Sequence, residues 1–274
     1  MATVAESSVS SRTASLVVTA PSLVARHVIA GFSHVGRFSR LVLELLRALR
    51  EWRQWVPRAV EQCQNVGYGS LFIVLLTASF AGAVTSLQAG YQFTGSVPLY
   101  VMGAVVTESI ILELAPVLSA LILAGRIGAR YAAELGTMRV TEQIDALESL
   151  GRNPVSHLLL PRVISGAVMV PVLVVVAILA GLLSGYLAAR SSLGITTYDF
   201  VYGSRYFFRS FDLWYALIKA EAFGVVVTII PCYVGFTAEA GAEGVGRATT
   251  TAVVWSSVTV LLLDTVLAQL LLPT

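Results

Sequence analysis

The sequence predicts an all-α integral membrane protein. Hydrophobic residues make up 56% of the 274 residues and charged residues only 12%, and the mean hydropathy is +0.79. Globular domains carry about 25% charged residues, so a soluble protein of this composition would have few side chains with which to cover its surface. Five apolar runs also reach the roughly 20 residues that a helix needs to cross a bilayer. Composition and run length together argue against an unusually apolar soluble fold.

Residues 1–32 are predicted to form a disordered tail on the cytoplasmic side. The first 22 residues are rich in Ser, Thr and Ala and include Glu6. They lack the unbroken apolar core of a secretory signal peptide, and they offer few large apolar side chains to bury. Residues 33–272 are expected to form one membrane domain.

An amphipathic helix is predicted over residues 37–58, directly before the first apolar run. Its polar side is rich in arginine, and its last turns hold Trp52 and Trp55. Arginine and tryptophan in these places are typical of a helix that lies in the membrane interface. An ordinary amphipathic helix packed on protein is the alternative. The apolar face comprises Phe38, Leu41, Val42, Leu45, Leu46, Leu49, Trp52 and Val56.

The five apolar runs predict five membrane spans with the termini on opposite sides. The second run is long and contains Glu108, Glu113 and Pro116, which predicts a helix that is tilted, kinked or locally unwound, or two half-helices. The spans are expected at about 68–92, 98–125, 160–189, 212–236 and 250–272.

Arginine in the connecting segments predicts the orientation, because cytoplasmic loops carry an excess of basic residues. With the N-terminus in the cytoplasm, the outer loops hold only Arg190, Arg205 and Arg209. The arginines on the inner side are then Arg12, Arg26, Arg37, Arg40, Arg47, Arg50, Arg53, Arg58, Arg126, Arg130, Arg139, Arg152, Arg162 and Arg247.

Small residues recur at helix-packing intervals in the first and third spans. Gly181 and Gly185 form a GxxxG motif, and Ala78 precedes Gly82 by four residues. This spacing lets two helix backbones approach closely in lipid. It fits a contact within one chain or between two copies.

A charged segment from Glu134 to Pro161 separates the second and third spans, and it predicts a short cytoplasmic helix over residues 141–150. Thr141 can cap its start, and Gly151, followed by Pro154, can end it. A helix of about ten residues is marginal alone, so we expect it to contact a partner. The residues expected to couple it to a separate ATPase are Glu142, Asp145, Leu147, Glu148 and Gly151.

The residues from Glu113 to Gly151, ELAPVLSALILAGRIGARYAAELGTMRVTEQIDALESLG, resemble the MlaE/YrbE family of ABC transporter permeases, which work with MCE-domain proteins. The stretch 145–151 with the later Leu160 and Pro161 is also similar to a loose form of the EAA loop of importer permeases, although its gap is shorter. The segments 246–251 and 263–264 resemble the family too. The resemblance extends over roughly residues 35–272.

The resemblance implies an MlaE-type permease domain over residues 33–272 that works as a homodimer, with an interfacial helix and a coupling helix in each copy. It implies transport of phospholipid or a related lipid between the bacterial inner (plasma) membrane and an MCE-domain protein. The chain lacks a G-x-x-x-x-G-K-[ST] phosphate loop, so ATP hydrolysis is expected in a separate ABC ATPase subunit. A small STAS-type regulatory subunit is a further implied partner.

Five ionisable residues lie inside the predicted spans, where such groups are costly and mark functional sites. Lys219 and Asp264 are each expected some ~10 to 12 Å below the outer ends of their spans at 1.5 Å per residue, so they can meet. The resemblance implies that these two form a charged cluster with Glu113 that is associated with transport; Leu112 departs from the arginine common in relatives. The five residues are Glu108, Glu113, Lys219, Glu221 and Asp264.

Four carboxylates then face one lysine within the spans. Either some of them are protonated in a low-dielectric site, or Arg205 and Arg209 reach down from the outer loop. A pair such as Lys219 with Asp264 can also serve only to fix helix packing, because a buried ion pair is weak evidence for stability but a plausible switch.

Lipid contact is expected on apolar faces of the first, second and fifth spans, for instance at Leu87 and Tyr91 near the outer mouth. An ion-coupled secondary transporter that uses the intramembrane carboxylates is the alternative function. Hydrolytic motifs such as G-x-S-x-G and HExxH are missing from the sequence, so no catalytic residue, metal site, cofactor or nucleic-acid partner is predicted.

Overall fold

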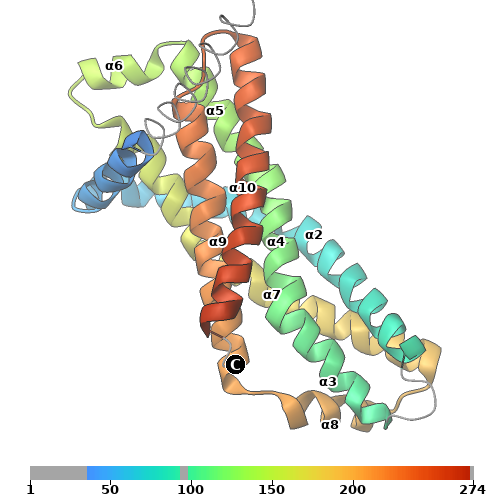
Figure 1. The fold of residues 1–274 in the computed structure, drawn as a ribbon. Helices are drawn as coiled ribbons and strands as arrows, with labels where there is room; N and C mark the ends of the chain where they lie inside the picture. The colour runs from blue at the N-terminus through green and yellow to red at the C-terminus, as the bar shows by residue number, and fades with distance from the viewer. Residues whose placement is uncertain (1–35, 93–97, 272–274) are drawn as a thin grey trace, which may run out of the picture. The chain divides into compact units, whose positions relative to one another are not determined.

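The computed structural model describes residues 36–92 and 98–271, and the regular secondary structure within these ranges is entirely helical (Figure 1). The predicted tail at 1–32 lies outside the described residues. The chain divides into two units, 1–47 and 48–274. The described part of the first unit, residues 36–47, is helical, and this helix ends at residue 48.

The predicted interfacial helix over 37–58 is therefore not one continuous helix. A turn at residues 49–50 separates the helix over 36–48 from α2, which begins at Trp52. Neither glycine nor proline stands at the break, so the sequence carries no local signal for it. Pro57 lies just inside α2.

The second unit contains the long helices and several short ones. Helix α2 spans Trp52–Gln92, α3 spans Leu99–Ser109, α4 spans Ala115–Leu123, α5 spans Ala129–Val140 and α6 spans Gln143–Ser149. Helix α7 spans Leu160–Leu193, α8 spans Thr197–Phe207, α9 spans Ser210–Phe236 and α10 spans Ala242–Leu271. Three π-helical turns lie between them: η1 at Ile110–Leu114, η2 at Ala124–Gly128 and η3 at Val155–Leu159.

Five helical segments of the described chain are long and apolar enough to cross a membrane, which confirms the predicted all-α membrane fold. Each is longer than its predicted apolar run. The segments are 52–92, 100–140, 155–193, 210–236 and 242–271. At 1.5 Å per residue the first two extend about 60 Å, twice the hydrocarbon thickness of about 30 Å. Polar helical turns therefore project beyond the bilayer.

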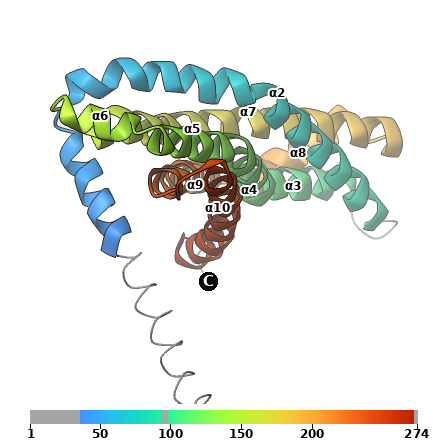
Figure 2. The same ribbon diagram turned by 90° about the horizontal axis from the view of Figure 1, so that it is seen from above.

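Helix α7 packs along α2 and, on another side, against α9. Figure 2 shows α2 on one side of the bundle and α9 and α10 on the other, with α4 and α5 between them. The α2–α7 contact is close because glycines meet: a Cβ at Gly82 would collide with the backbone carbonyl of Gly181. The small-residue spacing in the first and third spans thus serves a contact within one chain.

The second span is one helical run over 100–140 rather than two half-helices, and η1 and η2 interrupt its α-geometry. A π-turn holds one residue more than an α-turn and often occurs at a functional site. Glu113 lies in η1, three residues before Pro116 in the first turn of α4. The predicted local irregularity is therefore a π-turn.

Two short helices mark opposite ends of this bundle (Figure 1). Helix α6 follows α5 at one end, and α8 joins α7 to α9 at the other. We refer to these as the α6 end and the α8 end. Helix α8 also packs against α3.

Candidate functional site

Lys219 is the centre of an ion cluster inside the spans. Its side chain comes from α9 and is fully buried. Its Nζ lies 2.8 Å from Glu113 Oε2 in η1 and forms a second ion pair with Asp264 of α10. The cluster therefore joins three membrane-spanning segments through one ammonium group.

The third proton of Lys219 goes to the backbone. An ammonium has three donors, and the third contact is with the carbonyl oxygen of Leu112 at 3.0 Å. Because Pro116 has no N–H, the Leu112 carbonyl four residues earlier lacks its α-helical donor. Pro116 thus leaves the Leu112 carbonyl free to accept a hydrogen bond from Lys219. The same proline therefore accounts for the helix irregularity and for one contact of the charge cluster.

The two carboxylates of the cluster differ in exposure. The Asp264 side chain is 14% exposed, whereas that of Glu113 is 52% exposed. The Lys219 ammonium also lies 5.0 Å from the centroid of the buried Tyr215 ring, a distance at which an aromatic face attracts a cation. The Lys219 side chain is therefore enclosed by protein, whereas the Glu113 side chain lies at the open edge of the cluster.

Glu108 and Glu221 do not join this cluster. Glu108 lies near the end of α3, two residues before η1 begins, and Glu221 is exposed on α9. In residues 36–92 and 98–271 neither forms an ion pair, and neither do Arg205 and Arg209. That Arg205 and Arg209 compensate the acids stays one of two predicted alternatives, beside protonation of the acids. Arg209 directly precedes α9, and its backbone N–H donates to the Asp212 carboxylate.

The residues predicted for ATPase coupling lie on or beside α6, but the start of this helix differs from the prediction. Thr141 does not cap it: its hydroxyl donates to the carbonyl of Thr137 at 2.8 Å, because α5 continues to Val140. The residue before α6 is Glu142, in the left-handed region at φ 58°. Asp145 is held by Arg139 at 2.6 Å.

The end of α6 follows the predicted pattern. Gly151 has φ +72°, its N–H donates to Glu148 O, and the N–H of Arg152 donates to Leu147 O. This is a Schellman end, in which glycine supplies the left-handed residue at no steric cost. Glu148 is exposed, Leu147 is half-buried, and the neighbouring Leu150 is 75% exposed.

A second buried ion pair near the α6 end was not expected from the sequence. Arg162 of α7 is buried, and its Nη2 lies 3.1 Å from Glu134 Oε2 of α5. Arg130 holds the other Glu134 oxygen at 2.6 Å. The Arg162 guanidinium also lies 5.4 Å from the Tyr131 ring. The signal in the sequence is that Arg162 stands two residues inside an apolar run that begins at residue 160.

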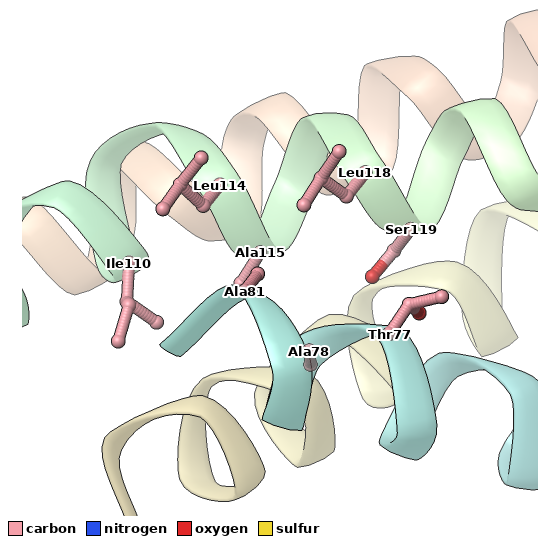
Figure 3. Close-up of a pocket in the computed structure, with 8 residues that line it drawn as sticks. All are labelled: Thr77, Ala78, Ala81, Ile110, Leu114, Ala115, Leu118 and Ser119. Carbon is pink, nitrogen blue, oxygen red and sulfur yellow. The ribbon is translucent and has the colours of Figure 1, made fainter. Parts of the chain in front are cut away.

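The residues predicted to contact lipid lie on the surface of α2. Leu87 is 44% exposed and Tyr91 is 84% exposed. Neither lines the small cavity between α2 and the second span, which Figure 3 shows. That cavity holds about 10 Å³, room for one water molecule at most, so it is no lipid site. Its lining is Thr77, Ala78, Ala81, Ile110, Leu114, Ala115, Leu118 and Ser119.

Five spans, three of which share an ion cluster, define a polytopic membrane protein with the intramembrane charges typical of transport proteins. The family model described as Permease MlaE matches residues 59–270, and the chain belongs to this family. The resemblance seen in the sequence is thereby confirmed.

Named relatives agree with this assignment. The chain is 37% identical over 248 residues to a probable ABC transporter permease protein of Rickettsia prowazekii, covering 90% of this chain and 96% of that protein. It is 41% identical over 197 residues to a probable ABC transporter permease protein of Synechocystis, covering 72% and 75%. It is also 35% identical over 230 residues to the chloroplastic protein TRIGALACTOSYLDIACYLGLYCEROL 1 of Arabidopsis thaliana, covering 84% and 65%. The chain is a transporter permease.

Proposed function

We propose that this chain is the permease subunit of an ATP-driven ABC transporter that moves phospholipid, or a related lipid, between the inner membrane and an MCE-domain protein. ATP would be hydrolysed in a separate subunit. The name of the Arabidopsis relative is that of a galactosyl diacylglycerol, a membrane lipid, which supports a lipid substrate. A small STAS-type subunit is a further proposed partner.

The observation that carries this proposal is the position of Glu113. Its carboxylate is half-exposed in one copy of the chain, yet it lies within a membrane-spanning segment and is paired with the buried Lys219. A charge in this place faces a protein interior or a water-filled cavity rather than lipid tails. The exposure of Glu113 at the open edge of the cluster is therefore an argument for a cavity beside it. One copy of the chain leaves this cavity open.

A second copy would close that cavity. Helices α10 and α2 are the least buried spans, with 17% and 28% of their most apolar windows buried. Large apolar side chains such as Trp255, Leu262 and Phe72 are exposed on them. These faces supply apolar surface for a homodimer and for lipid tails between its copies, among them the predicted lipid contacts Leu87 and Tyr91.

Helix α6 is the proposed contact with the ATPase. It presents the carboxylates of Glu142 and Glu148 to solvent, together with the apolar side chain of Leu150. Asp145, Leu147 and Gly151 fix its shape and seating. The arginine-rich segments predict the N-terminus and α6 on the cytoplasmic side, which would place the α8 end and the MCE partner on the opposite side.

The alternative, an ion-coupled secondary transporter, would need carboxylates that can release a bound cation. Glu113 and Asp264 are both already paired with Lys219, and the relatives are named as ABC transporter permeases. Both points favour the ATP-driven transporter.

The test is co-purification of proteins and lipids with the full chain from its native membrane. We expect an ATPase, an MCE-domain protein and phospholipid. The variant Glu142→Lys/Glu148→Lys should lower ATPase recovery by about tenfold, as expected when charges are reversed at an interface. The control Ser191→Lys/Ser192→Lys puts two lysines on exposed positions at the end of α7 and should leave recovery unchanged. Recovery of neither an ATPase nor an MCE protein with the unmodified chain would overturn the proposal.

A further inference from the structure

Three tyrosines form a stacked row on the exposed side of α8. The rings of Tyr198 and Tyr202 lie 6.0 Å apart at 15°, and those of Tyr202 and Tyr206 lie 5.7 Å apart at 29°. The spacing of four residues places them on one face of the helix. All three are exposed, Tyr198 at 76% and Tyr206 at 66%.

The opposite face of α8 fixes this row in place. Phe200 and Gly203 are buried against α3, where a Cβ at Gly203 would collide with the carbonyl of Tyr100. Ser204 accepts a hydrogen bond from Thr107 at 2.8 Å. Because α8 is held along α3, its tyrosine row is a rigid surface.

The tyrosine row lines a groove of about 580 Å³ together with Thr197, Val201 and Arg205. Arg205 is exposed, and within the described part of the chain it has neither an ion pair nor a hydrogen bond to protein. The groove thus combines one uncompensated positive charge with aromatic walls. That combination fits an anion attached to an apolar body.

The groove lies where the membrane surface must be. Only two residues separate α8 from the membrane-spanning helix α9, and the first turns of α9 expose Phe211 at 44% and Trp214 at 66%. Tyrosine and tryptophan are enriched at the level of lipid headgroups. Exposed aromatic side chains therefore follow one another along the chain from the groove on α8 into the first turns of α9.

We propose that this groove binds the phosphate headgroup of a phospholipid in the membrane surface at the α8 end. Arg205 would pair with the phosphate, since a guanidinium fork matches phosphate oxygens. The hydroxyls of Tyr198, Tyr202 and Tyr206 would donate to phosphate or ester oxygens, and their rings would contact the glycerol and the first carbons of the acyl chains. The inference requires only that the chain lies in a membrane, so it is independent of the transported substrate.

The test is photocross-linking of the full chain in phosphatidylglycerol vesicles. A benzophenone amino acid placed at Val201 in the groove should form a phospholipid adduct, detected by mass spectrometry of the α8 peptide. Arg205→Gln should lower the adduct yield about fivefold, the factor that one basic side chain contributes at an anionic membrane surface. Arg205→Lys should keep most of the yield.

A benzophenone at Phe72, which is 75% exposed on α2, is the control for contact with lipid in general. Its lipid adduct should not depend on Arg205. Either of two results would overturn the proposal: an adduct at Val201 with protein in place of lipid, or a lipid adduct whose yield is the same with and without Arg205.

Discussion

The contribution of the ion cluster to stability can be tested by removing the charges of Lys219 and Asp264, first singly and then together. Lys219→Met leaves the Asp264 carboxylate, 14% exposed, without a counter-charge. Removing one partner of a buried pair costs about 3 to 5 kcal/mol. The half-exposed Glu113 can be hydrated and adds at most about 1 kcal/mol. We therefore expect Lys219→Met to lower the free energy of unfolding by about 3 to 5 kcal/mol.

The double variant Lys219→Met/Asp264→Asn should recover much of this loss. It removes the uncompensated charge as well as its partner, and replacing both charges of a buried pair is often nearly neutral. A double-mutant cycle should then give a coupling energy on the order of 2 kcal/mol between the two residues. The measurement is equilibrium unfolding of the full chain in mixed micelles with increasing sodium dodecyl sulfate, followed by tryptophan fluorescence.

Glu221→Gln is the matched control, because Glu221 is an exposed acid on the same helix and should change the unfolding free energy by no more than about 0.5 kcal/mol. The reasoning is refuted if the double variant is as unstable as Lys219→Met alone. In that case the lysine would contribute packing and not charge pairing.

Two further variants test the packing of the bundle. Gly82→Ala should destabilise the protein by about 1 to 3 kcal/mol, because its Cβ would collide with the backbone of α7; Gly125→Ala, with open space around its Cα, should be neutral or stabilising in the same unfolding measurement. Arg162→Met should cost about 1 to 3 kcal/mol, because it removes the buried partner of Glu134 and leaves this carboxylate with Arg130 alone. Arg130→Met removes the more exposed partner and should cost about 1 kcal/mol or less. Equal effects of the two arginine variants would contradict the role assigned to burial.

Apolar run length predicted the existence of the spans but not their ends. Helix α2 begins at Trp52, well before the predicted start near residue 68. A run of apolar residues marks where a helix enters lipid, and hydrogen bonding of the backbone continues through polar residues beyond it. The same reason explains why α5 extends to Val140 and why Thr141 ends one helix instead of starting the next.

Helix α8 was not predicted, although its sequence carries a start signal. Thr196 accepts a hydrogen bond from the Asp199 N–H at 3.1 Å and donates to its carboxylate at 2.6 Å, a form of the capping box. Tyr198, Tyr202 and Tyr206 follow at helical spacing. By contrast, the pairing of Lys219 with the Leu112 carbonyl depends on which side chain reaches a freed acceptor across two helices, and no pattern along the chain encodes that.

The π-turn η1 has a consequence for changes in chain length. Because a π-turn contains one residue more than an α-turn, deleting one residue between Ile110 and Leu114 can convert it to a regular α-turn while the helix on each side keeps its rotational setting. A deletion in an α-helical part of the run over 100–140, outside η1 and η2, would rotate one half by about 100° relative to the other and turn its buried face outward. The extra residue can therefore be lost with the bundle intact, but Glu113 would no longer be placed to meet Lys219.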